Sequence, residues 1–237
     1  MGVILNLETA SSVCSVALAV DGKLVALKES SEKNSHAGNI TKFIGEVTGE
    51  VAMEYSQLDA IAVSKGPGSY TGLRIGVSTA KGLCCAIEKP LIAISTLQSM
   101  AFQIIQKSPI FSGYEKEKVL FCPMIDARRM EVYCALFDIN NAIIGKEEAM
   151  IIDHDSFENE LHDHTIIFFG DGAAKCNAYL SHQPNAVFYD DIHPSATAMI
   201  ALSEGKFIMK EFEDVAYFEP FYLKEFVAGK PKVKGLS

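Results

Sequence analysis

The sequence lacks several features that would place it in a common class. No apolar run approaches the roughly 20 residues that a membrane-spanning helix needs, and the first residues, MGVILNLET, contain no basic segment or cleavage site. We therefore interpret this start as a strand and expect a cytoplasmic protein. Basic residues are also few: 21 Lys and Arg against 30 Asp and Glu give a net charge of −9. This balance argues against wholesale binding to nucleic acid.

Cysteine and histidine show no pattern of a redox or metal motif. The six cysteines form no Cys-x-x-Cys pair and stand among apolar or small neighbours, so we interpret them as buried, reduced thiols. No histidine occurs between His36 and His154, and neither HExxH nor GxSxG is present. The sequence thus has no metallopeptidase or esterase signature.

Strand and helix signals alternate along the first half of the chain. Asp21-Gly22 is a strong hairpin-turn signal between two apolar runs. Strands are predicted at 3–7, 12–20, 23–29, 58–64 and 90–95, and helices at 40–51, 71–87 and 97–106.

After a linker at 107–118 the order of elements begins again. Strands are predicted at 120–125, 131–138, 142–150 and 165–169, and helices at 173–181 and 195–204. One constant, ungapped offset overlays Glu8 on Asp126, Ala17-Leu18 on Ala135-Leu136, and Lys28-Glu29 on Lys146-Glu147. This predicts an internal duplication. We expect two α/β lobes, 1–107 and 118–218, followed by an irregular tail at 219–237.

The stretch SKGPGSYTGLRIG, residues 64–76, is similar to phosphate-binding loops but fits neither common template. A Walker A loop needs a lysine after its last glycine, and Gly72 is followed by Leu73. The glycine spacing is one residue too long for a dinucleotide fingerprint. The stretch therefore predicts a sharp strand-to-helix turn, with Pro67 fixing φ and Gly68 free to take a positive φ.

The helix after this turn carries an apolar stripe, formed by Leu73, Val77, Ala80, Cys84 and Ile87. It also contains Gly72, Gly76 and Gly82, and a glycine inside a helix costs about 1 kcal/mol relative to alanine. Three interpretations stay open: packing on its own sheet, docking against a helix of a second chain, and contact with a nucleotide.

Several segments together resemble one known family. These are VILNLETASSVCSVAL, SKGPGSYTGLRIGVSTAKGL, PLIAISTLQSMA, MIDARRMEVY, FGDGA and FEPFYLK, which are similar to the TsaB (YeaZ) family. TsaB is a subunit of bacterial tRNA threonylcarbamoyladenosine biosynthesis. The resemblance implies an α/β fold with two lobes of the actin, Hsp70 and sugar-kinase type (a duplicated RNase H-like fold). It implies a non-catalytic subunit whose partners are the catalytic paralogue TsaD, the ATPase TsaE and, through the complex, tRNA. When alone, such a subunit is expected to form a homodimer.

The resemblance also implies that the two helices of the first lobe form the partner interface. The expected interface residues are Ile40, Phe43, Ile44, Val47, Leu73, Arg74, Val77, Ala80, Lys81 and Cys84. The catalytic paralogue holds a metal through a His-x-x-x-His pair, which would fall on Thr96 and Met100 here. Neither is a plausible ligand. We therefore expect no catalytic metal site, no required cofactor and no enzymatic activity of the chain alone.

Weak nucleotide binding is a further expectation, because kinases of this fold hold phosphates with turns at the start of each lobe. The matching candidates are Thr9, Ser11, Ser12, Asp126, Arg128, Gly170, Asp171 and Gly172. The first turn lacks a glycine, and Glu8 is one methylene longer than the usual Asp, which disfavours tight Mg²⁺ geometry. Asp126 and Arg128 could instead pair with each other. The alternative function is a stand-alone ATP-binding phosphotransferase or hydrolase of the same fold.

Two polar regions are interpreted as solvated. Two short segments contain residues that could bind zinc, but we expect them to be solvated loops: Asp153-His154-Asp155 and His162-Asp163-His164. The tail lysines are expected to lie in a solvated end, with contact to tRNA or a partner as the alternative: Lys224, Lys230, Lys232 and Lys234.

Overall fold

The computed structural model describes residues 2–31, 36–107 and 113–224. In chain order the first part forms β1 (Val3–Glu8), β2 (Cys14–Val20), β3 (Lys23–Ser30), α1 (His36–Glu50), β4 (Ala60–Gly66), α2 (Tyr70–Ile87), β5 (Leu91–Ser95) and α3 (Thr96–Ile105). The second part forms β6 (Val119–Asp126), β7 (Glu131–Phe137), β8 (Ile143–Ile151), α4 (Glu158–Asp163), β9 (Thr165–Phe169), α5 (Ala173–Leu180), β10 (Ala186–Tyr189) and α6 (Ala196–Met209). Short 3-10 turns lie at Tyr55–Gln57 and Lys116–Lys118. Every predicted strand and helix is present, with ends shifted by a few residues; α4 and β10 were not predicted.

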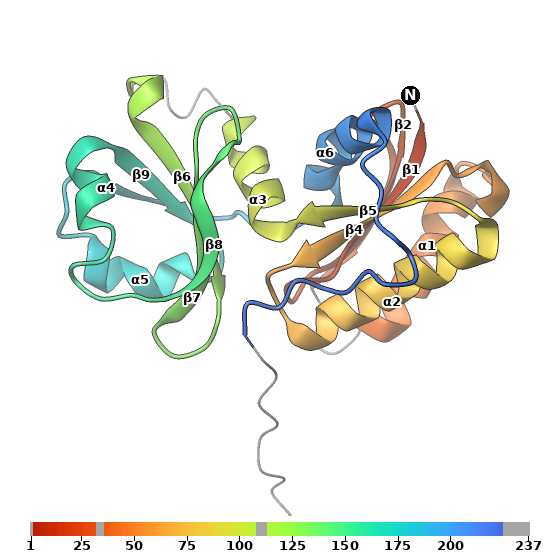
Figure 1. The fold of residues 1–237 in the computed structure, drawn as a ribbon, viewed down its shortest axis with the longest axis horizontal. Coiled ribbons are helices and arrows are strands. Elements are labelled where there is room, and N and C mark those ends of the chain that lie inside the picture. The colour runs from red at the N-terminus through yellow and green to blue at the C-terminus, as the bar shows by residue number, and fades with distance from the viewer. Residues whose placement is uncertain (1, 32–35, 108–112, 225–237) are drawn as a thin grey trace, which may run out of the picture.

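Two five-stranded sheets give the chain two α/β lobes that lie side by side (Figure 1). The strand order is β3-β2-β1-β4-β5 in the first lobe and β8-β7-β6-β9-β10 in the second, so the two sheets have the same topology. In each, the first three strands are antiparallel and the last two run parallel to the first. The predicted fold class, a duplicated two-lobed α/β fold of the actin, Hsp70 and sugar-kinase type, is confirmed.

The shared topology supports the duplication, but the single ungapped overlay is wrong beyond the first strand. Glu8 pairs with Ser15 across the first hairpin, whereas Asp126 pairs with Val132 across the second. The second connection is therefore one residue shorter, which shifts β7 relative to the predicted overlay. The other two matched pairs do not occupy equivalent positions, so their identity is coincidental.

One helix from each half packs on the sheet of the other half. α3 follows the first sheet in the chain, yet its Leu97 and Met100 lie in a core cluster with Phe121 of β6. α6 follows the second sheet, yet it packs on β1, β2 and β5 of the first lobe. The predicted lobes 1–107 and 118–218 thus describe chain order, while the packing exchanges one helix in each direction.

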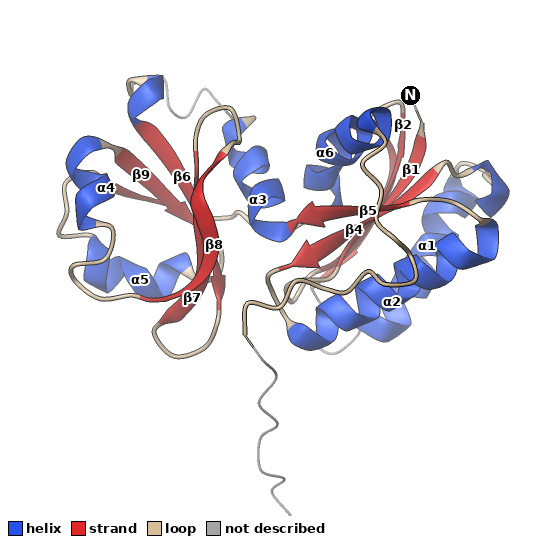
Figure 2. Cartoon of the chain, viewed as in Figure 1, coloured by secondary structure: helices blue, strands red, loops and turns tan. Residues whose placement is uncertain are grey.

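The other face of the first sheet is covered by α1 and α2 (Figure 2). α1 packs on β2 and β3, α2 packs on β4, and the two helices contact each other. The face of this helix pair that points away from the sheet is therefore a surface of the molecule. No helix in the described parts of the chain has both the length and the apolar character to cross a bilayer.

After α6 the chain returns along α2 as a segment that we call the C-terminal strap, residues 211–224. The amide of Glu213 donates to the Leu91 carbonyl at 2.9 Å, and the amide of Phe221 donates to the Lys65 carbonyl at 2.7 Å. The strap is thus held at the start of the edge strand β5 and near the end of the neighbouring strand β4.

The strap then reaches the second lobe, where Lys224 forms an ion pair with Glu131. The tail predicted to begin at residue 219 is therefore packed as far as residue 224. The predictions for Lys230, Lys232 and Lys234 lie outside the described residues.

All six cysteines are free thiols. Five are buried, as predicted: Cys14, Cys84, Cys122, Cys134 and Cys176. Cys85 is exposed, which corrects the prediction for that residue.

Candidate functional site

The glycine-rich stretch packs against the turn that follows β1. A Cβ atom on Gly68 would lie 2.3 Å from the Ala10 carbonyl oxygen, and one on Gly72 would lie 2.0 Å from the Thr9 carbonyl oxygen. On Gly76 it would lie 2.2 Å from the Thr9 hydroxyl. These glycines are therefore explained by close approach of the chain's own atoms, which are backbone oxygens at Gly68 and Gly72 and a side-chain hydroxyl at Gly76.

The first amides of α2 are also engaged by the chain itself. The Ser69 amide donates to the Ala10 carbonyl at 2.6 Å, and the Gly72 amide donates to the Ser69 hydroxyl at 3.3 Å. Gly66, not Gly68 as predicted, takes the positive φ, at 110°. The stretch is a turn that joins β4 to α2 against the β1–β2 connection.

Glu8 lies at the end of β1 and is fully buried beneath this turn. Its Oε1 accepts hydrogen bonds from the Ala10 amide at 2.6 Å and from the Ser64 hydroxyl at 2.8 Å. Its Oε2 is buried without a partner in the described structure. Burial raises the pKa of the Glu8 carboxyl to about 7, because the charged form loses its hydration.

Glu8→Gln is expected to remove a pH dependence from the stability of the fold. The folded-state pKa of about 7 exceeds the ordinary 4.5, so wild-type stability is retained below about pH 4.5 and falls as pH rises through about 7. The difference in pKa corresponds to about 3 kcal/mol at most. Urea unfolding from pH 4.5 to 8.5 should show the variant gaining on the wild type as pH rises. Parallel curves for the two proteins would contradict this role of burial.

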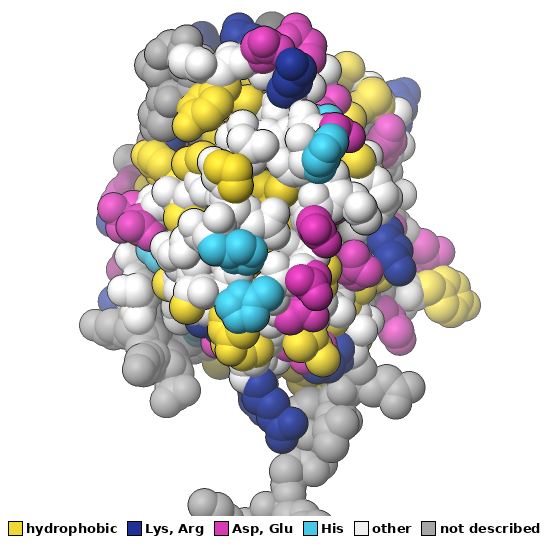
Figure 3. Space-filling view, turned by 90° about the vertical axis from the view of Figure 1, so that its left-hand side faces the viewer, with side chains coloured by type: hydrophobic (Ala, Val, Ile, Leu, Met, Phe, Trp, Pro, Cys, Tyr) yellow, Lys and Arg dark blue, Asp and Glu magenta, His cyan; other side chains and the backbone are white. Residues whose placement is uncertain are grey.

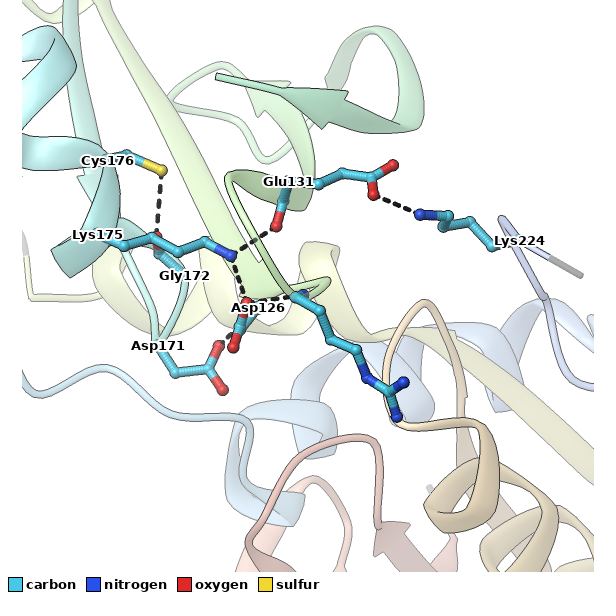
Figure 4. A network of polar contacts seen from close by, with 8 residues as sticks. Asp126, Glu131, Asp171, Gly172, Lys175, Cys176 and Lys224 are labelled. Carbon is cyan, nitrogen blue, oxygen red and sulfur yellow. Dashed lines mark hydrogen bonds and ion pairs between the residues drawn. The ribbon is translucent and has the colours of Figure 1, made fainter. Parts of the chain in front are cut away.

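The corresponding turn of the second lobe is a network of polar contacts around Asp126 (Figure 4). Asp126 Oδ1 accepts from the Arg128 amide at 2.9 Å and pairs with Lys175, which also donates to the Glu131 carbonyl at 2.7 Å. The Asp126 amide donates to Asp171 Oδ1 at 3.0 Å. The predicted lock between Asp126 and Arg128 therefore runs through the backbone amide of Arg128, and the ion pair is made with Lys175.

Two kinds of effect act in opposite directions on the pKa of the Asp126 carboxyl. Burial alone would raise the pKa of its carboxyl, but hydrogen bonds from Lys175 and the Arg128 amide, with the two positive charges, lower the pKa below its usual range. The carboxylate is thus charged at neutral pH and fixed on Lys175. The sequence spacing did not indicate that Lys175 and Glu131 would take part in this network.

The remaining nucleotide candidates divide by burial. Thr9 is buried and its hydroxyl donates to the Gly72 carbonyl at 2.8 Å, while the Ser11 hydroxyl accepts from the Val13 amide at 3.1 Å. Ser12 and Asp171 are exposed. Both glycines of the Gly-Asp-Gly turn are needed by packing, because a Cβ on Gly170 would lie 2.4 Å from the Met124 carbonyl and one on Gly172 2.9 Å from Val132.

Most of the predicted interface residues lie beneath α1 and α2, facing their own sheet. The buried ones are Ile40, Phe43, Ile44, Val47, Leu73, Val77, Ala80 and Cys84. Lys81 donates to the carbonyls of Ala216 and Phe218 in the strap, at 3.1 and 2.9 Å, and Arg74 is exposed. This corrects the prediction: the apolar stripe is the core face of each helix, because the sheet already covers it.

The opposite side of the two helices carries small residues. We call the small exposed residues the α1–α2 outer face: Gly45 and Gly49 of α1 with Ser78, Gly82 and Cys85 of α2. The two helices also expose Thr41, Lys42, Glu50, Thr71, Arg74 and Ala86. A Cβ on Gly49 or Gly82 would meet no atom within 4 Å, and one on Gly45 would meet only the Tyr55 hydroxyl at 3.8 Å. Unlike Gly72 and Gly76, these glycines are not required by packing within the described chain.

Comparison with known proteins assigns the family. A family model described as TsaD, tRNA N6-adenosine threonylcarbamoyltransferase, matches residues 26–228. The chain belongs to this family. It is 28% identical to the tRNA threonylcarbamoyladenosine biosynthesis protein TsaB of Haemophilus influenzae, over 96% of this chain and 95% of that protein. To TsaB of Escherichia coli it is 29% identical, over 96% of both.

Solved structures support the same fold. YeaZ from Pseudomonas aeruginosa superimposes with a TM-score of 0.76 at 22% identity, covering 94% of this chain and 100% of that one. The resemblance of this TsaD-family chain to TsaB (YeaZ), inferred from the sequence, is confirmed.

Two positions were matched to the His-x-x-x-His pair by sequence. They are Thr96 and Met100, and both are buried at the start of α3. Over residues 2–31, 36–107 and 113–224, no three or more His, Cys, Asp or Glu side chains form a group able to hold a metal ion. At the outer end of the second lobe, histidines lie among acidic side chains (Figure 3). There the ring of His154 lies 5.7 Å from that of His182, and both are exposed.

Proposed function

We propose that the chain is a non-catalytic subunit of the machinery that forms threonylcarbamoyladenosine in tRNA. It binds and activates a catalytic TsaD-type subunit, with a TsaE-type ATPase as a further partner and tRNA reached through the complex. Similarity to TsaB proteins over nearly the full length of the chain supports this role. The proposal includes a cytoplasmic location, no required cofactor, and only weak nucleotide binding at the two hairpin turns.

The observation that carries the proposal is the glycine content of the α1–α2 outer face. Gly45 and Gly82 lie inside helices, where each costs about 0.5–1 kcal/mol relative to alanine. Among the described residues nothing needs them to lack a side chain. Close packing of helices from another subunit would use it, because small contact residues let two helix axes approach to about 8 Å, the short end of the usual 8–10 Å range.

The same face would serve a homodimer when no catalytic partner is present. A two-fold dimer uses one self-complementary patch on both copies. Homodimer and heterodimer therefore exclude each other, and adding the TsaD-type subunit should convert one into the other.

Cys85 provides a direct test, because it is the exposed thiol on this face. Burial raises the pKa of Cys84 to about 12 and those of Cys14 and Cys176 to about 11, so a maleimide at neutral pH should label Cys85 first. With the TsaD-type protein of the same genome, we expect a 1:1 complex by size exclusion. Labelling of Cys85 in that complex should be slower by about tenfold or more than in the chain diluted until it is monomeric, measured by intact mass.

Denatured chain, in which all six thiols should react, is the control for the reagent. A complex that leaves Cys85 labelling unchanged would place the interface elsewhere, and failure to form any complex would contradict the proposed function. The alternative of a stand-alone phosphotransferase has no specific observation in its favour among the described residues, since the Ser69 and Gly72 amides already bind oxygens of the chain.

A further inference from the structure

Arginine is rare in this chain, and its distribution is uneven. Among 21 Lys and Arg residues only Arg74, Arg128 and Arg129 are arginines. All three are exposed. Within the described residues none of them forms an ion pair, although acidic side chains outnumber basic ones. Three unpaired arginines on a protein of net charge −9 need an explanation outside the fold.

The C-terminal strap connects the positions of these arginines. Arg74, near the start of α2, lies over the ring of Tyr70 at 5.6 Å, and the centroids of the Tyr70 and Tyr222 rings lie 4.7 Å apart with the planes tilted by 33°. Two residues further on, Lys224 pairs with Glu131, at the end of the turn that carries the other two arginines (Figure 4). The arginines of both lobes therefore border one surface at the lobe junction.

Aromatic rings on this surface stay open to solvent beside the positive charges. Tyr222 is 36% exposed and Phe221 is 39% exposed, and the Lys65 ammonium lies 5.9 Å from the Phe221 ring. We call Arg74, Arg128 and Arg129, with Tyr70 and Tyr222, the junction patch. Rings that offer a face beside arginine are the chemistry that holds unstacked bases and the phosphates between them.

The turn that presents two of the arginines has an unfavourable backbone. Arg128 has φ 70° and Arg129 has φ 48°, left-handed values that glycine and asparagine adopt far more readily than arginine. The neighbouring network takes its hydrogen bond from the backbone amide of Arg128, and the Arg128 charge adds a Coulombic attraction to Asp126. No hydrogen bond or ion pair among the described residues uses either guanidinium group. Strain kept at exposed positions points to a use for the side chains.

We propose that the junction patch binds RNA, with the arginines on backbone phosphates and the Tyr70–Tyr222 pair stacked on an unpaired base. This rests on the proposed function, which supplies tRNA as the RNA. A protein with a net negative charge attracts RNA only weakly at long range, so the binding must come from short-range contacts. Arginine provides such contacts, because its guanidinium group can form two hydrogen bonds with a phosphate and can stack on a base. The guanidinium fork would also bind the carboxylates of an acidic protein partner, so the open aromatic rings beside the arginines are what favours RNA.

The test measures binding of an unmodified tRNA transcript to the full chain by fluorescence anisotropy at several salt concentrations. We expect Arg128→Ala and Arg129→Ala each to weaken binding by about five- to tenfold at 0.1 M salt. Each should also lower the salt slope by about 0.7–0.9, the value for one lost phosphate contact. Lys118→Ala, which removes an equal charge from an exposed residue paired with Glu115, should change affinity by less than about twofold.

A second variant separates binding from folding. In Arg128→Asn/Arg129→Gly both new residues suit the left-handed turn, so the melting temperature should hold or rise while RNA affinity falls by about tenfold or more. Tyr222→Ala should weaken binding of the transcript, and Tyr222→Phe should retain it.

Three results would overturn the inference. RNA binding could be unchanged in the double variant. Millimolar ATP could displace the transcript, which would make the patch a mononucleotide site. The double variant could lose the TsaD-type partner but keep RNA, which would make it a protein contact. Failure of this inference is distinguishable from failure of the proposed function, because Cys85 protection by the TsaD-type subunit does not depend on the two turn arginines.

Discussion

Gly82→Arg is expected to weaken association with the TsaD-type subunit by about 100-fold while the isolated chain stays folded. The new side chain would project from the α1–α2 outer face, where no atom of residues 2–31, 36–107 or 113–224 lies within 4 Å of its Cβ, so the monomer has room for it. A partner helix that packs on this face would be held away, and a loss of about 2.7 kcal/mol corresponds to the stated change in Kd. Replacing a glycine inside a helix should also raise the melting temperature by about 2 °C.

A matched control exists on the opposite side of the same lobe. Gly205 lies in α6, and a Cβ there also meets no atom within 4 Å. Gly205→Arg should therefore keep both the fold and the association, whereas Gly45→Arg in α1 should behave like Gly82→Arg. Association would be measured by isothermal titration calorimetry, and activity by threonylcarbamoyladenosine formed in the reconstituted complex. Normal pairing of Gly82→Arg would remove α2 from the interface.

This prediction differs from one based on the sequence, for a physical reason. An apolar stripe with helical spacing reports that one face of a helix is buried, but not what buries it. Phe43 and Val77 were assigned to a partner, and both face the chain's own sheet. The partner surface is instead indicated by glycines that lack a contact, which becomes visible only when neighbouring atoms are placed.

Local signals predicted the regular elements well, and long-range packing was beyond them. Asp21 and Gly22 both take positive φ in the predicted hairpin turn. The four-residue β10 and the six-residue α4 are too short to show a period, and α4 begins after Phe157, which has no side-chain cap. The one-residue difference between the hairpins at Glu8 and Asp126 could not be seen without strand pairing.

The exchange of α3 and α6 between lobes also has no local signature. Both helices are apolar enough to pack on either sheet, and their destination is fixed by tertiary contacts such as the hydrogen bond from Ser203 of α6 to Asn6 of β1, at 2.7 Å. For the same reason the sequence predicts an irregular tail from residue 219 and assigns the first part of the strap, 211–218, to the second lobe. The strap's hold on the first lobe includes backbone groups, namely the amides of Glu213 and Phe221 and two carbonyls that accept from Lys81, and a sequence does not display such contacts.

Gly72→Ala is expected to destabilise the fold by about 3 kcal/mol. Its Cβ would lie 2.0 Å from the Thr9 carbonyl oxygen, a backbone atom that cannot rotate away, so α2 or the β1–β2 connection must move. The Thr9 hydroxyl, which donates to the Gly72 carbonyl, would lose its geometry as well. Thermal and urea unfolding of the isolated chain measure the effect, and Gly82→Ala in the same helix should instead stabilise by about 0.5–1 kcal/mol.

These two alanine variants decide what the glycine-rich stretch is for. A phosphate-binding loop has glycines so that a ligand can approach its backbone. Alanine in such a loop would leave the stability of the ligand-free protein unchanged and would abolish ATP binding. A loop that fits against its own chain loses stability with no ligand present. Because the oxygens nearest to Gly68, Gly72 and Gly76 belong to Thr9 and Ala10, the second outcome is expected. A Gly72→Ala protein as stable as the wild type would show that the β1–β2 connection yields, and would reopen the phosphate interpretation.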